Sequence, residues 1–87
     1  MGMHCKGLTK LIEECGELTQ VAAKKQAYLD DKIHPDGSDL EIRLQEEIAD
    51  VLAAIDFVII TLKLDDPAIT TRKYSKFNQY IEWAKQP

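Results

Sequence analysis

An apolar repeat in the second half of the chain constrains the fold more than any other feature. Apolar side chains recur there at intervals of four and three residues, at Leu44, Ile48, Val51, Ile55, Val58 and Leu62. Because successive residues of an α-helix are rotated by about 100°, this spacing places all of them on one face of a helix. Between residues 51 and 60 the remaining faces are apolar too, except at Asp56. Such a helix needs neighbours on more than one side, so we predict that other helices surround it.

The first third of the chain has a similar stripe. Its members predict a helix over residues 4 to 29 and are Leu8, Leu11, Cys15, Leu18 and Ala22. Cys5 and Cys15 are separated along this helix by roughly 15 Å, at a rise of about 1.5 Å per residue, which is too far for a disulfide. Reduced thiols are typical of intracellular proteins, and we predict a cytoplasmic location.

Two breaks separate the helical stretches. The first contains the turn sequence PDG at 35–37, and the SDLE segment at 38–41 matches the Ser-x-x-Glu capping box. The second helix is therefore predicted to begin at Ser38. Asp66 followed by Pro67 is typical of an N-cap and a first helical residue, so a third helix is predicted over residues 67 to 85.

The predicted class is all-α, because no segment shows the alternation of a β-strand. We predict a single domain over residues 1–87 with three main helices. The first and third helices are too few to surround the apolar second helix. A chain this short also gains much of its stability from a partner chain. We therefore predict that several chains pack into an oligomeric helical bundle, as a homodimer or a homotetramer.

The charge balance narrows the choice of partners. Eleven Lys and Arg residues against 15 Asp and Glu residues give a net charge of −4, the wrong sign for a surface that binds nucleic acid phosphates. The longest apolar tract, residues 51–60, has half the roughly 20 residues of a membrane span. Residues 1–10 lack an apolar core flanked by a cleavage site, so we expect no secretory signal there. We expect neither a nucleic acid nor a membrane as a partner.

Acidic residues occur with the same spacing in the first and second predicted helices. The two groups are Glu13, Glu14 and Glu17, and Glu46, Glu47 and Asp50. At about 100° per residue, Glu14 and Glu47 fall beside the apolar stripe, whereas Glu13 and Glu46 point away from it. Exposed Glu is common on helices, yet like charges three residues apart destabilise a helix by a few tenths of a kcal/mol. No Lys or Arg follows either group at three or four residues to offset this.

Converging carboxylates without an imidazole suit a hard divalent cation, and Mg²⁺ is the predicted ion, with Mn²⁺ as the alternative. Zinc fits this set poorly. A di-iron bundle normally supplies a Glu-x-x-His motif, but neither His4 nor His34 follows a Glu by three residues.

The segments LIEECGELTQ at 11–20 and QEEIADVLAAID at 45–56 resemble the MazG-like, all-α nucleoside triphosphate pyrophosphohydrolases. That group also includes dimeric dUTPases and dCTP pyrophosphatases, and its motif is E-x-x-E on one helix and E-x-x-D on the next. The resemblance covers roughly residues 8 to 62 and implies one MazG-like domain. It implies a catalytic site in which Mg²⁺ is bound by Glu14, Glu17, Glu47 and Asp50.

The activity implied by the resemblance is hydrolysis of an NTP or dNTP to the monophosphate and pyrophosphate. Family members use basic and amide side chains of a later helix to hold phosphates. The substrate-binding candidates are accordingly Arg72, Lys73, Lys76 and Asn78, together with Lys10 and Gln20 near the first motif. A solvated basic face is an equal alternative for the third helix. Arg43 is a further phosphate candidate, and a base could stack on Tyr28, His34 or Trp83.

Two other interpretations remain open. The chain could be a non-catalytic helical oligomerisation or interaction module, or a family member that has lost turnover. Asp56, inside the apolar tract, must be paired if it is buried. An ion pair between subunits is the preferred interpretation for Asp56, and a role in the site is the alternative.

Overall fold

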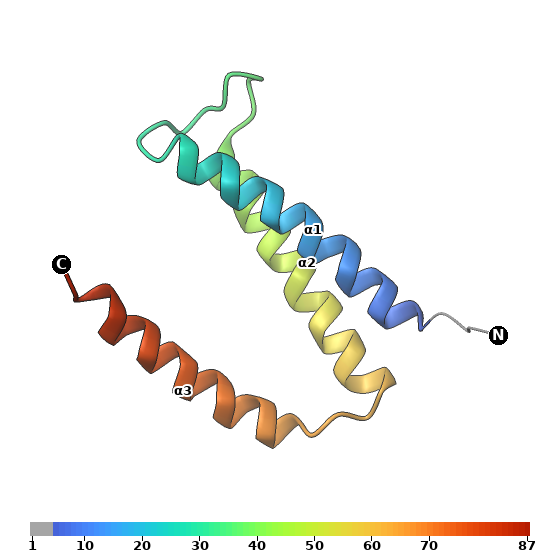
Figure 1. The fold of residues 1–87 in the computed structure, drawn as a ribbon. Coiled ribbons are helices and arrows are strands. Elements are labelled where there is room, and N and C mark those ends of the chain that lie inside the picture. The colour runs from blue at the N-terminus through green and yellow to red at the C-terminus, as the bar shows by residue number, and fades with distance from the viewer. Residues whose placement is uncertain (1–4) are drawn as a thin grey trace.

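The computed structural model describes residues 5–87 and consists of three α-helices joined by two loops (Figure 1). Helix α1 spans Lys6–Ala27, α2 spans Leu40–Thr61 and α3 spans Asp66–Ala84. The predicted all-α class with three helices is confirmed for this part of the chain. The predicted helix start at residue 4, and His4 itself, lie outside the described residues. Within residues 5–87, no helix combines the length and the apolarity that crossing a bilayer requires.

The second helix begins two residues later than predicted. Its N-cap is Asp39, whose carboxylate accepts hydrogen bonds from the backbone N–H groups of Glu41 at 3.0 Å and Ile42 at 3.1 Å. Ser38, the predicted cap, instead donates its hydroxyl to Asp36 Oδ1 at 2.6 Å. The prediction was wrong because Ser38 and Asp39 are both good capping residues, and the preceding turn already engages the first of them.

The third helix shows a similar displacement. Asp65 is the N-cap and accepts a hydrogen bond from the backbone N–H of Ala68 at 3.1 Å, so the helix begins at Asp66 rather than at Pro67. The predicted cap, Asp66, therefore lies in the first helical turn. An acidic side chain is favourable there as well, because the N-terminus of a helix carries partial positive charge.

Helices α1 and α2 pack side by side as an antiparallel pair (Figure 1). The buried core of this pair consists of Val21, Leu40, Val51, Ala54 and Val58. The two helices approach closely at Gly7, where an added Cβ would lie 3.0 Å from Thr61 Oγ1 and 3.3 Å from a methyl group of Val58. Cys5 and Cys15 are both free thiols, as their separation along the first helix predicts.

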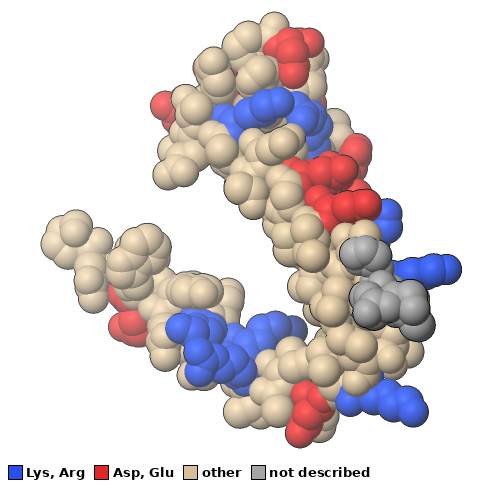
Figure 2. Space-filling model, turned by 45° about the vertical axis from the view of Figure 1, so that its right-hand side comes forward, with Lys and Arg blue, Asp and Glu red and all other residues tan. Residues whose placement is uncertain are grey.

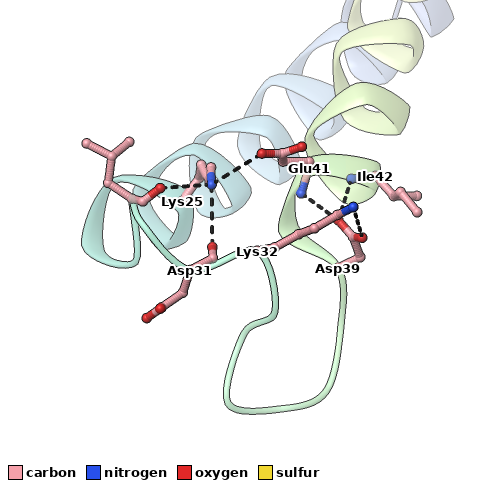
Figure 3. Close-up of polar contacts among 7 residues, drawn as sticks. Lys25, Asp31, Lys32, Asp39, Glu41 and Ile42 are labelled. Atoms are coloured by element: carbon pink, nitrogen blue, oxygen red, sulfur yellow. Dashed lines mark hydrogen bonds and ion pairs between the residues drawn. The ribbon is translucent and has the colours of Figure 1, made fainter.

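The loop between α1 and α2 is fastened to both helices (Figure 3). Lys25, near the end of α1, donates a hydrogen bond to the backbone carbonyl of Asp31 at 3.4 Å, and its ammonium lies 3.8 Å from the carboxylate of Glu41. Lys32 lies 3.7 Å from the capping carboxylate of Asp39. These contacts tie the loop to the end of α1 and to the start of α2.

Helix α3 leaves the pair and stands apart from it (Figure 1). None of its 19 residues is buried, and α1 and α2 are the only two helices that pack extensively within the described chain. The radius of gyration is 16.0 Å, whereas a compact chain of this length has about 12 Å. One chain therefore does not enclose the apolar second helix.

Candidate metal centre

Three of the four predicted ligands meet on the α1–α2 pair. Glu14 comes from α1, while Glu47 and Asp50 come from consecutive turns of α2. Each offers one carboxylate oxygen such that the three atoms all lie within 4.8 Å of one another. Figure 2 shows the acidic side chains on this pair, separated from the basic side chains of α3. The antiparallel packing thus brings together acids that are more than 30 residues apart in the sequence.

Two of these carboxylates are partly buried and incompletely paired. The Oε2 atoms of Glu14 and Glu47 are inaccessible to solvent and have no hydrogen-bond partner. Burial raises the pKa of the Glu14 carboxyl, and the charges of Glu17 and Asp50 raise it further. Burial likewise raises the pKa of Glu47, followed by the charges of Glu17, Asp50 and Glu14. A buried, unpaired carboxylate oxygen is costly, and a bound cation would remove that cost.

The fourth predicted ligand, Glu17, lies next to this group. Its charge acts on both Glu14 and Glu47 and raises the pKa of each carboxyl. Its oxygens are not among the three ligand atoms, from Glu14, Glu47 and Asp50, that lie within 4.8 Å of one another. The role of Glu17 as a ligand stays a prediction.

Lys10 and Glu13 form an ion pair beside the acids. The ammonium of Lys10 donates a hydrogen bond to Glu13 Oε2 at 2.9 Å, and both side chains are more than half exposed. This hydrogen bond is the main cause of the raised pKa of Lys10, and the charges of Glu13, Glu14 and Glu17 add to it. The positive charge of Lys10 therefore interacts electrostatically with the acidic group.

Within one chain, the predicted phosphate-binding residues of α3 do not lie beside the acids of α1 and α2. Arg72 and Lys73 line a groove between α2 and α3, and Asn78 borders a shallow hollow farther along α3. Lys76 is half-buried on the same helix. Their proposed contact with substrate stays a prediction, and a single chain does not provide it.

No contact joins the other candidates to the acids among the described residues. Arg43 donates a hydrogen bond to the hydroxyl of Ser38 at 3.1 Å and thus turns toward the loop. The rings of Tyr28 and His34 pack edge to face, with their centroids 5.1 Å apart. Trp83 is 72% exposed near the C-terminal end of α3, and Gln20 is exposed on α1.

The sequence predicted apolar side chains on nearly all faces of α2 from Val51 onward, but not that some of them form a second stripe. Leu52, Ile55 and Ile59 line the groove that faces α3, and its volume is about 550 Å³. The signal was present, because Ile48, Leu52, Ile55 and Ile59 are also spaced by four, three and four residues. The stripe predicted at residues 44–62 combined members of this set with residues that pack against α1.

The donor set determines which ligands this centre could bind. Three carboxylates supply oxygen atoms only, and together they carry three negative charges when ionised. Hard divalent cations such as Mg²⁺ and Mn²⁺ prefer such ligands and complete their coordination with water or with phosphate oxygens. The residues present therefore fit Mg²⁺ in type and in charge.

A comparison with known proteins finds no match to this chain among family models, curated proteins or solved structures. The resemblance to the MazG-like group therefore depends on the two acidic motifs and on their order along the chain.

Proposed function

We propose that this protein is a Mg²⁺-dependent nucleoside triphosphate pyrophosphohydrolase of the MazG-like type, which converts an NTP or dNTP to the monophosphate and pyrophosphate. The single observation that carries the proposal is the meeting of Glu14, Glu47 and Asp50, with ligand atoms within 4.8 Å of one another. These are acids of the two motifs that resemble the family. A cytoplasmic location, where nucleotides are abundant, belongs to the same proposal.

In this proposal Glu14, Glu47 and Asp50, which come from both motifs, hold the cation. When bound, Mg²⁺ would neutralise charge on the triphosphate and lower the pKa of the attacking water. Glu17 lies beside the three ligands, but its oxygens are not among the atoms that lie within 4.8 Å of one another. It is therefore the acid available to accept a proton from that water. Lys10, held by Glu13 at 2.9 Å, offers a positive charge to the phosphate chain.

The electrostatics of the metal-free site also favour a cation. Glu14 and Glu47 have raised pKa values because burial and neighbouring acids disfavour their ionised forms. A group of acids that repel one another gains stability when a divalent cation neutralises them. Acids whose only role is to keep a helix soluble are normally exposed to water. Here two carboxylate oxygens, one from Glu14 and one from Glu47, are buried and have no hydrogen-bond partner.

The test is pyrophosphate release from a panel of the eight common NTPs and dNTPs with Mg²⁺. We expect release from at least one nucleotide, and a loss of about 100-fold or more in the Glu47→Gln variant. The Glu46→Gln variant is the matched control, since it removes one charge from the adjacent, exposed position. Equal activity of the two variants would contradict the assignment of the site.

The second candidate is a non-catalytic oligomerisation or interaction module. It is favoured by α3, in which no residue is buried although it carries Tyr74, Phe77 and Trp83. This candidate predicts no pyrophosphate release with any nucleotide of the panel and no stabilisation by Mg²⁺. The two functions are therefore separated by the same experiments.

A further inference from the structure

Phe57 is the only aromatic residue of helices α1 and α2. It follows Asp50 by seven residues on α2, so at about 100° per residue the two side chains leave the helix within about 20° of each other. The groove beside α3 is lined by other faces of α2, which include Leu52 and Ile59. Phe57 is 46% exposed. An aromatic ring is therefore accessible on the side of the α1–α2 pair that carries the candidate metal centre.

Two contacts between the helices place Phe57 along the seam from the acids. Glu14 of α1 meets Asp50 of α2 at the candidate metal centre. Seven residues before Glu14, Gly7 lies beside Phe57, since a Cβ added to Gly7 would be 3.6 Å from Phe57 Cδ2. The helices are antiparallel, so the seam leads from the acids to Phe57 over seven residues on both of them, or about 10 Å at 1.5 Å per residue.

The strip of surface between the acids and the ring has small side chains on α2 and a cation on α1. Of the residues between Asp50 and Phe57, only Ala53 and Ala54 lie within about 60° of the line along the helix that joins these two. Each of them has only a methyl group. On α1, Lys10 lies one turn from the acids in the direction of Phe57, and its side chain is more than half exposed. The strip thus has room for a sugar and its phosphates, with a positive charge beside them.

The separation of the acids from the ring matches the length of a nucleotide. About eight bonds join the base to the β-phosphorus, and they span about 9 Å when extended, since three bonds of a polypeptide span about 3.5 Å. A nucleotide whose β-phosphate is held at the acids therefore places its base at Phe57, about 10 Å away. Stacking on an aromatic ring is favourable for every base, because each base has a π face.

We propose that Phe57 is the residue on which the base of the nucleotide stacks, and that purine nucleotides are the preferred substrates for this reason. A purine has two fused rings and covers more of an aromatic ring than a pyrimidine does. The inference rests on the proposed pyrophosphohydrolase function and adds a binding residue outside the two acidic motifs. It replaces the base-stacking candidates of the sequence. Tyr28 packs against His34, and Trp83 lies on α3, outside the α1–α2 pair.

The first test compares the steady-state kinetics of Phe57→Leu and Phe57→Tyr with the wild type, using Mg²⁺ and the same nucleotide panel. Leu is apolar and similar in size but has no ring. Stacking is the same before and during the reaction, so KM should rise about 10-fold or more in Phe57→Leu while kcat changes less than about 3-fold. Phe57→Tyr keeps the ring, and its KM should stay within about 3-fold of the wild type. The wild type should prefer purine nucleotides, and this preference should shrink in Phe57→Leu. An unchanged KM in Phe57→Leu, or a wild-type preference for pyrimidines, would overturn the proposal.

Two controls separate a contact with the base from a general effect on the fold or the site. Leu52→Ala removes another exposed apolar side chain, from the side of α2 that faces the groove, and it should leave KM unchanged. Inorganic tripolyphosphate has no base, so as a competitive inhibitor it should bind the wild type and Phe57→Leu equally well. If tripolyphosphate weakened as much as the nucleotides did, Phe57 would support the site as a whole and the proposed contact would be wrong. Circular dichroism should show the same helix content in every variant.

The second test is a binding measurement that does not need turnover. Trp83 is the only Trp of the chain, so Phe57→Trp combined with Trp83→Phe leaves one indole, at position 57. ATP with Mg²⁺ should quench the fluorescence of this indole by stacking on it, whereas tripolyphosphate with Mg²⁺ should not. Absence of quenching by any nucleotide would overturn the proposal. Pyrophosphate release by a wild type that is insensitive to Phe57→Leu refutes this inference alone. Quenching without pyrophosphate release supports the base contact and refutes the enzymatic activity.

Discussion

Replacement of Glu47 by Gln tests whether the acidic group binds a cation or only supports the fold. Gln has the same shape as Glu but no charge, so packing beside the α1–α2 seam is kept. In the absence of metal, burial and three neighbouring acids raise the pKa of Glu47. Removal of its charge relieves that repulsion, and the metal-free variant should melt at the same temperature as the wild type or slightly higher.

The size of the expected metal effect follows from mass action. A site of three carboxylates with a dissociation constant of about 1 mM is typical of weak oxygen-ligand sites. At 10 mM Mg²⁺ such a site stabilises the folded state by about 1.4 kcal/mol. For a domain of 87 residues this corresponds to a rise of about 6 to 11 °C in Tm. Loss of one of three ligands should weaken binding about 100-fold, which leaves a shift of less than about 1 °C.

The assay is a thermal melt of the wild type, Glu47→Gln and Glu46→Gln, each in EDTA and in Mg²⁺. Potassium chloride at matched ionic strength separates site binding from general screening. The control variant should keep the full shift, because Glu46 is exposed. If Glu47→Gln melted markedly lower in EDTA and kept its response to Mg²⁺, Glu47 would be a structural residue and the reasoning about the site would be refuted.

Two further predictions concern stability. Stability without metal should fall as pH rises from about 4.5 through the raised pKa values of Glu14 and Glu47, because the folded state retains protons that the unfolded state releases. In urea titrations in EDTA, the advantage of Glu47→Gln over the wild type should therefore grow from pH 5 to pH 7, and a constant difference would contradict this. Leu40→Ala should lower the free energy of unfolding by about 2 to 5 kcal/mol, since Leu40 is 0% exposed at the start of α2. A loss below about 1 kcal/mol would show that α2 does not depend on this contact.

The helices were predictable because their signals are local. The spacing of apolar residues predicted the end of α1 within two residues. The capping pattern predicted the start of α2 within two residues as well, but it selected Ser38 where two capping residues are adjacent. The choice between Ser38 and Asp39 depends on the hydrogen bond from Ser38 to Asp36, which closes the preceding turn. A contact of that kind is not part of the capping pattern, so the pattern alone selects the wrong residue.

The apolar stripe of α2 shows where a local pattern is insufficient. Periodicity places residues 44 to 62 on one face, but the structure divides them between two neighbours. Val51 and Val58 are buried against α1, whereas Ile55 turns toward the groove beside Leu52 and Ile59. A helix that is apolar nearly all round has no single preferred face, and only the position of α1 decides which residues it buries.

The sequence by itself determined the three helices and the matched acidic motifs, because both depend on spacing along one chain. It also indicated that Glu14 and Glu47 lie beside the apolar faces of their helices. Only the tertiary structure decided that these two acids meet Asp50, while the basic residues of α3 lie elsewhere. The physical reason is that proximity between residues of different helices is set by how α1 packs against α2. Burial beside that seam then raises the pKa of the acids, which no spacing of residues specifies.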